Sequence, residues 1–136
     1  MPHTKFRAEV LTPEGEVFND EVEMVSTKTA VGSIGILANH EPVLAMLDPS
    51  ELRLYKTESE VVRFAQAEGY MQMAGNHVLI LVEEATPPGD LDAGALRERL
   101  QQADRELESA GEDTEKRRVA ERDKARLEQF LKIAQS

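Results

Sequence analysis

The chain has 136 residues, of which 26 are acidic and 16 basic, so its formal net charge is -10. Because such an acidic chain repels phosphate backbones, nucleic acid is excluded as a partner. The absence of cysteine excludes disulfides, thiolate metal sites and cysteine nucleophiles. The longest uninterrupted apolar runs have five residues, as at 78–82, whereas a membrane helix needs ~20. Since the first ten residues lack the apolar stretch of a signal peptide, we expect a cytoplasmic or equivalent location.

Residues 1–86 carry the pattern of short strands. Phe6, Ala8 and Val10 alternate with charged residues, which is typical of a strand with one buried face. Several short strands separated by turn residues predict an antiparallel sandwich or barrel. Residues 78–82 are apolar throughout, so this strand is expected to be buried on both faces. The other strand segments are 21–24, 51–55, 62–66 and 70–73, and the predicted turns are Pro13-Glu14-Gly15 and Gly75-Asn76.

Residues 87–136 change to the helical period after the breaker Thr86-Pro87-Pro88-Gly89. Asp90 and Asp92 mark the start of a first helix, where carboxylates favour the positive end of the helix dipole. Gly111 ends it, and the short connection to a second helix predicts an antiparallel hairpin. The apolar stripe of the first helix consists of Leu96, Leu100, Ala103, Leu107 and Ala110.

The second helix is predicted to begin at Thr114 as its cap. Much of the apolar surface of the hairpin is alanine, which buries little area per residue. A hairpin packed so weakly is physically able to have two positions, although a permanently docked hairpin is an open alternative. The predicted stripe consists of Ala120, Leu127, Leu131 and Ala134, with Val119, Phe130 and Ile133 beside it.

A search for reactive groups finds little. The sequence contains no phosphate loop, dinucleotide fingerprint or nucleophile elbow. His3, His40 and His77 have no second histidine at metal-ligand spacing, and Gly32-Ser33-Ile34-Gly35 by itself indicates a turn. These observations argue against an enzyme, a cofactor and a metal site.

The second helix is basic between residues 116 and 132, where seven bases and three acids give a local balance of +4. One interpretation is a solvated face with intrahelical pairs, such as Glu121 with Arg118 and Lys124. The other is a docking surface for an acidic protein partner.

The run Gly32-Ser33-Ile34-Gly35-Ile36-Leu37-Ala38-Asn39-His40-Glu41-Pro42 resembles the Gly-x-x-Gly-Ile-Leu-Pro-x-His-x-Pro segment of the epsilon subunit of F-type ATP synthases. Leu11-Thr12-Pro13-Glu14-Gly15 and residues 76–85 resemble that family's first turn and last sandwich strand. Glu68-Gly69-Tyr70 is similar to its Gly-Gly-aromatic step. The sequence departs at Ala38, where the family usually has proline, and at Glu68, where the first glycine is usual.

The resemblance implies an α+β fold, in which an N-terminal antiparallel β-sandwich, residues 1–86, precedes an antiparallel α-helical hairpin, residues 87–136. It implies a non-catalytic central-stalk subunit of a proton- or sodium-driven synthase, with no cofactor. The sandwich would couple the gamma subunit to the c-ring, and the hairpin would restrain ATP hydrolysis. Contact with the c-ring or gamma is expected at Gly35, Ile36, Leu37, His40, Glu41 and Pro42.

The resemblance also implies that the hairpin reaches the alpha/beta catalytic head, and we assign Arg118, Arg122 and Arg126 to a regulatory basic face. The expected location is peripheral, on the cytoplasmic face of the bacterial membrane, with attachment only through the complex. The plastid stroma is the alternative.

Some members of the family bind ATP on the folded hairpin through an Ile/Leu-Asp-x-x-Arg-Ala motif. In this sequence Ala95 occupies the arginine position, so we expect no ATP binding. The alternative function is a nucleotide-sensing adaptor of the same architecture, for which Asp92 and Arg126 are the candidate nucleotide residues. An unrecognised hydrolase would require a catalytic constellation that the sequence does not contain.

Overall fold

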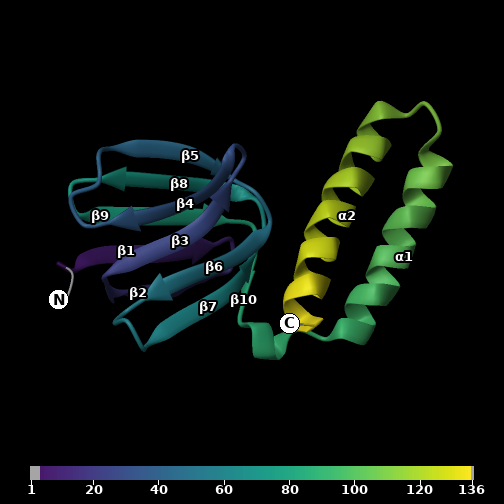
Figure 1. Ribbon diagram of the computed structural model, residues 1–136. Helices are drawn as coiled ribbons and strands as arrows, with labels where there is room; N and C mark the ends of the chain where they lie inside the picture. Colours follow the sequence, from purple (N-terminus) through teal and green to yellow (C-terminus); the bar gives the residue numbers. More distant parts are fainter. Residues whose placement is uncertain (1–3, 136) are drawn as a thin grey trace. The chain divides into compact units, whose positions relative to one another are not determined.

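The computed structural model describes residues 4–135, so His3 lies outside the described part of the chain. The chain divides into two compact units between Pro87 and Pro88 (Figure 1). The first unit consists of strands and the second of helices, which confirms the α+β fold class.

Ten strands lie in the described part of the first unit. They are short and separated by turns, as the alternation of apolar and polar residues predicts. The strands are β1 (Phe6–Thr12), β2 (Gly15–Val22), β3 (Met24–Thr29), β4 (Gly32–Leu37), β5 (Val43–Leu47), β6 (Ser50–Tyr55), β7 (Val61–Gln66), β8 (Gly69–Ala74), β9 (His77–Val82) and β10 (Ala85–Thr86).

The strands form two layers of a sandwich. One layer has the order β10-β7-β6-β3 with β4 on the far side of β3, and the other has the order β5-β8-β9-β1-β2. The two layers are joined between β3 and β5, where Thr29 pairs with Leu47. Among the described strands, every pairing is antiparallel except that β1 runs parallel to β9. Parallel pairing is possible here because β1 and β9 are far apart in the sequence, so no tight turn has to connect them.

The core lies between the two layers. Phe6, Ala8 and Val10 on β1 are buried, as their alternation predicts. The expectation for residues 78–82 was wrong, because only alternate residues of β9 face the core and Leu81 is exposed. The buried apolar cluster contains Phe6, Ala8, Val10, Val22, Val25, Ile36, Leu47, Leu52, Leu54, Phe64, Met71, Met73, Val78, Ile80 and Val82.

The alternation predicted across residues 21–24 also breaks. Val22 ends β2 in one layer and Met24 begins β3 in the other, so Glu23 is the residue at which the chain crosses between layers. Glu23 is buried as a result, although its place in the pattern put it outside, and its backbone N–H donates to the Tyr55 carbonyl at 2.7 Å.

A buried amide fastens three segments of the sandwich. The Gln66 side chain is fully buried, and its Oε1 accepts a 2.7 Å hydrogen bond from Thr27 Oγ1. Its Nε2 donates to the Asp48 carbonyl at 2.8 Å and to Ser50 Oγ at 3.2 Å. Because a buried amide is costly when unpaired, this complete set of partners specifies how β3, β7 and the turn before β6 meet.

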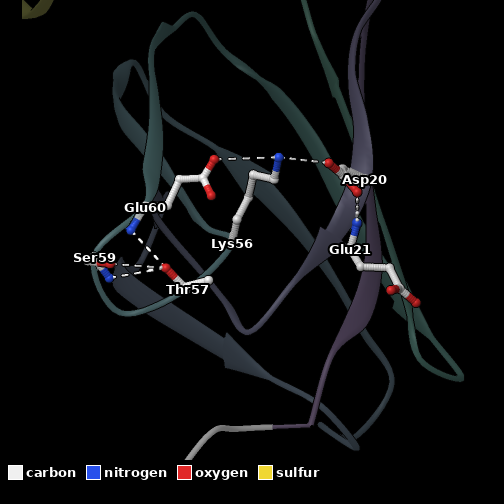
Figure 2. Close-up of polar contacts among 6 residues, drawn as sticks. All are labelled: Asp20, Glu21, Lys56, Thr57, Ser59 and Glu60. Carbon is white, nitrogen blue, oxygen red and sulfur yellow. Dashed lines mark hydrogen bonds and ion pairs between the residues drawn. The ribbon is translucent and has the colours of Figure 1, made fainter.

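A lysine joins the two layers at their edge (Figure 2). Lys56, which follows β6, places Nζ 3.0 Å from Asp20 Oδ2 on β2 and 3.7 Å from Glu60 Oε1. The hydrogen bond from Lys56 is the main cause of a lowered pKa of Asp20. Since β2 and β6 belong to different layers, this contact links strands that share no backbone hydrogen bonds.

The second unit is a helical hairpin. After a 3-10 turn, η1 (Pro88–Asp90), it contains α1 (Ala93–Ala110) and α2 (Thr114–Gln135). Asp92 caps α1 by accepting from the Ala95 N–H at 3.1 Å, and Gly111 ends it with a φ of 55°. With φ of 55° and ψ of -119°, Gly111 has a backbone conformation that glycine adopts at little cost.

One expectation for the second helix was wrong, and another was correct only in part. Asp113, and not Thr114, caps α2, because its Oδ1 accepts from the Lys116 N–H at 3.1 Å. A carboxylate one residue before the helix is as good a cap as a hydroxyl. The buried stripe of α2 consists of Ala120, Leu127, Phe130 and Ile133. Leu131 and Ala134 are only half-buried, since the large side chains of Phe130 and Ile133 lie at the centre of the stripe.

Candidate functional site

The most specific sequence motif, residues 32–42, covers β4 and the loop at residues 38–42, which carries the chain from β4 in one layer to β5 in the other. Glu41 and Pro42 are exposed and His40 is half-buried. His40 Nδ1 donates to the Glu41 carbonyl at 2.7 Å, and its backbone N–H donates to the Leu37 carbonyl at 3.2 Å. Both bonds are local to the loop, which presents polar groups to solvent.

The predicted contact residues do not all reach the surface. Leu37 and Gly35 on β4 are exposed on the outer side of their layer. Ile36 lies between them in the sequence, and because side chains alternate along a strand it points inward, where it is 0% exposed within the core cluster. Ile36 therefore cannot offer its side chain to a partner.

An exposed apolar surface that the sequence reasoning missed covers the outer side of the other layer. Met46 on β5 pairs with Tyr70 on β8, and Tyr70 pairs with Leu81 on β9. Leu44 lies two residues before Met46 on the same side of β5. The exposed fractions are 74% for Leu44, 60% for Met46, 54% for Tyr70 and 45% for Leu81. We call these four residues the apolar face.

The apolar face continues at both ends. Leu11 on β1 pairs with Leu81 and is half-buried, and a hollow of about 310 Å³ beside them is lined by Leu11, Pro13, Tyr70 and Leu81, among others. At the other end, Ala30 N–H donates to the Met46 carbonyl at 3.0 Å. This bond fixes the β3–β4 turn, in which Val31 is 99% exposed. An apolar surface that spans neighbouring strands is typical of a protein–protein contact.

The sequence contained a signal for this surface. Residues 43–47 are apolar at five consecutive positions, which gives a strand apolar side chains on both faces. The inward face of β5 is used by Leu47, so the remaining apolar residues are left to solvent or to a partner.

The basic stretch of α2 is partly paired within the hairpin. Arg118 makes two hydrogen bonds to the Glu115 carboxylate, at 2.7 and 3.2 Å. These hydrogen bonds, and secondly the positive charge of Arg118, hold the pKa of Glu115 below its ordinary value. Arg122 lies 3.8 Å from Asp123 Oδ1. Arg118, Arg122 and Arg126 recur every four residues, so they share one side of the helix.

The two intrahelical pairs expected for Glu121 do not form. Lys124 Nζ contacts Asp104 Oδ1 on α1 at 3.0 Å, and this hydrogen bond raises the pKa of Lys124. Glu121 is instead 3.9 Å from Arg117, one turn earlier on α2. The reason is that Lys124 faces α1, where it pairs with the Asp104 carboxylate instead of Glu121.

The candidate nucleotide residues Asp92 and Arg126 do not line the hollow between the two helices. Asp92 already serves as the cap of α1. A hollow of about 200 Å³ between the helices is lined by Arg99, Gln102, Ala103, Glu106, Asp123 and Leu127, and contains neither Asp92 nor Arg126. Among residues 4–135, no three histidine or acidic side chains gather in a way that would hold a metal ion.

No helix within the described part of the chain has the length and apolar character required to cross a membrane.

Comparison with known proteins adds a family to this geometry. The family model described as "ATP synthase, Delta/Epsilon chain, beta-sandwich domain" matches residues 5–88. The ATP synthase epsilon chain of Sulfurihydrogenibium sp. (strain YO3AOP1) is 32% identical, over 95% of this chain and 96% of that relative. The ATP synthase epsilon chain of Persephonella marina (strain DSM 14350 / EX-H1) is 38% identical, over 93% of each chain.

Solved structures share the fold at lower identity. A chain of the Euglena gracilis mitochondrial ATP synthase matches with a TM-score of 0.81 and 21% identity, over 97% of this chain and 82% of that chain. A chain in the central stalk and c-ring of the Tetrahymena thermophila mitochondrial ATP synthase matches with a TM-score of 0.66 and 17% identity. The match covers 98% of this chain and 99% of that chain.

Proposed function

Because the chain belongs to the ATP synthase epsilon-chain family, we propose that it is a central-stalk subunit that links the gamma subunit to the c-ring. As an epsilon chain it is a non-catalytic subunit of the synthase. It would be held peripherally at the cytoplasmic face of the bacterial membrane, and only through the other subunits.

The observation that carries this proposal is the apolar face. Four large apolar side chains at Leu44, Met46, Tyr70 and Leu81 lie together on a rigid sheet, and each is 45% or more exposed. Exposure of such a surface to water is unfavourable, and association with another protein removes it from water. We assign the apolar face to gamma, and Leu37, His40, Glu41 and Pro42 to contact with the c-ring or gamma.

The second unit is suited to a regulatory role. The buried residues of α1 are Leu96, Ala103 and Ala110, two of them alanines, so α1 contributes little apolar area to the packing of the hairpin. Arg118, Arg122 and Arg126 place three positive charges on one side of α2, which favours an acidic partner although Arg118 is paired with Glu115. We propose that the hairpin extends to the alpha/beta head and there restrains ATP hydrolysis.

A charged residue on the apolar face should weaken binding to gamma. The double variant Leu44→Lys, Met46→Lys places two ammonium groups where the partner has to exclude water. We expect its Kd for purified gamma subunit to rise about tenfold or more, since central apolar contacts carry much of an interface's binding energy. The affinity is measured by titration with the isolated gamma subunit of the same organism.

The matched control is Val17→Lys, on β2 outside the apolar face, where valine is also exposed. We expect it to leave the Kd unchanged, and all variants to unfold at the wild-type denaturant concentration because no core residue is altered. An unchanged Kd for the double variant would remove the gamma assignment.

A further inference from the structure

Two asparagines from distant parts of the chain exchange hydrogen bonds beside the partner-binding loop. Asn39 N–H donates to Asn76 Oδ1 at 2.7 Å, and Asn76 Nδ2 donates to Asn39 Oδ1 at 3.2 Å. Asn39 lies in the loop between β4 and β5, whereas Asn76 lies in the turn between β8 and β9. The pair therefore ties the loop to a hairpin of the opposite layer.

Asn39 has a φ of 64°, and it is the one residue other than glycine with a positive φ in the described part of the chain. Since His40 N–H donates to the Leu37 carbonyl at 3.2 Å, residues 37–40 form a β-turn with positive φ at its third position, which is a type II turn. The second position of such a turn favours proline, which fixes φ in advance, but here it is Ala38. The turn thus lacks its usual internal restraint.

The Asn76 side chain is not needed by its own turn. Gly75, with a φ of 60°, makes the tight turn between Ala74 and His77, which are paired across the hairpin. The backbone of Asn76 is fixed as well, because its carbonyl accepts from the Arg7 N–H on β1 at 3.0 Å. The backbone that carries the Asn76 carboxamide is therefore fixed, and the carboxamide can bond to Asn39 in the neighbouring loop.

We propose that Asn76 is a positioning residue for the rotor-binding loop, which replaces the missing proline restraint by holding Asn39 in the left-handed conformation. The inference rests on the proposed function, because the loop is taken to contact the c-ring or gamma. In this arrangement His40, Glu41 and Pro42 meet the partner in one conformation. The loop then loses less conformational entropy when it binds. Both asparagines are exposed, so their bonds contribute little to folding stability and act mainly on the loop.

Removal of the Asn76 carboxamide tests the inference. In the variant Asn76→Ala, we expect the Kd for ATP synthase stripped of its epsilon subunit to rise about fivefold, as the fraction of loops in the binding conformation falls. The amide hydrogen of His40 should exchange faster, while the denaturation midpoint stays at the wild-type value. The second variant Asn76→Ala, Ala38→Pro should return both the affinity and the exchange rate toward wild type, because proline restores the restraint at the turn itself.

The control Asn19→Ala removes another exposed asparagine, one that accepts from Arg7 Nη1 at 3.2 Å, and should leave the Kd unchanged. If Leu44→Lys, Met46→Lys weakens binding to the stripped synthase but Asn76→Ala does not, the positioning role is wrong and the proposed function stands. Failure of Ala38→Pro to restore the affinity lost in Asn76→Ala would also overturn it. If none of these variants alters the Kd, the proposed function itself is wrong.

Discussion

Deletion of residues 88–136 is expected to raise ATP hydrolysis by the assembled synthase while the remaining sandwich still folds and joins the rotor. All members of the buried apolar cluster lie between Phe6 and Val82, so the deletion removes none of them. The shortened chain also keeps β10, which pairs with β7. The hydrolysis rate should rise about twofold if half of the complexes are restrained at a given moment, and more if the restrained fraction is larger.

Charge reversal on the second helix should reproduce part of that increase. We expect Arg118→Glu, Arg122→Glu and Arg126→Glu together to weaken the hold of the hairpin on an acidic head. The difference from wild type should shrink at high salt, since exposed charges are screened beyond about 8 Å at physiological ionic strength. The matched control reverses Arg97, Arg99 and Arg105 on α1 and should leave the rate unchanged.

Two results would contradict this interpretation of the hairpin. Equal hydrolysis rates with and without residues 88–136 would make the hairpin a structural appendage. A shortened chain that fails to fold would instead show that the sandwich depends on the second unit.

Substitution of alanine for Gly69 should cause the largest loss of stability of any single methyl addition to the glycines of the sandwich. A Cβ at residue 69 would overlap the Leu81 carbonyl oxygen and lie 2.7 Å from Val82 Cα, and both atoms belong to the backbone of β9. Because Gly69 pairs with Val82 in the sheet, β9 cannot move away without breaking the ladder. We expect the free energy of unfolding to fall by about 3 kcal/mol or more, by the overpacking seen when atoms are forced into filled space.

The control is Gly35→Ala on β4, where the nearest atom to a new Cβ is Met24 Sδ at 4.0 Å. The free energy of unfolding of that variant should lie within about 1 kcal/mol of the wild-type value, since alanine is tolerated better than glycine in a regular strand. Urea denaturation of the purified chain measures both. A Gly69→Ala protein as stable as Gly35→Ala would show that β8 and β9 are not packed as closely as described.

Gly69 also explains which glycine of the family's Gly-Gly step is indispensable here. Glu68, the departure noted in the sequence, is half-buried, and its carbonyl accepts from the Glu83 N–H at 3.1 Å, so a side chain fits at this position. The next residue is the one that faces the backbone of β9. The sequence pattern alone does not distinguish the two, because the distinction depends on how close the neighbouring strand lies.

The periodic elements were predictable from the sequence because periodicity reports local geometry. The period-two alternation of Phe6, Ala8 and Val10 and the helical spacing from Leu96 to Ala110 both appear in the structure. Features set by the neighbours of a residue were not predictable. Leu81 is exposed although its strand is apolar throughout, and Glu23 is buried because the chain changes layers there.

The candidate site likewise has one part that the sequence predicts and another that it does not. The motif at residues 32–42 was visible in the sequence. The buried position of Ile36, however, follows from its side of β4, and the apolar face follows from strand pairing. Tyr70 and Met46 are 24 residues apart in the numbering and adjacent only in the sheet. No local pattern joins them.

Co-purification from the organism's own membranes is the most direct test of the assignment to the central stalk. A chain carrying an affinity tag at residue 136 should bring down the gamma subunit and the c-ring in a constant ratio after detergent extraction. The Leu44→Lys, Met46→Lys variant should bring down much less of both. Recovery of the tagged wild-type chain without gamma, from membranes in which gamma and the c-ring remain assembled with each other, would contradict the account.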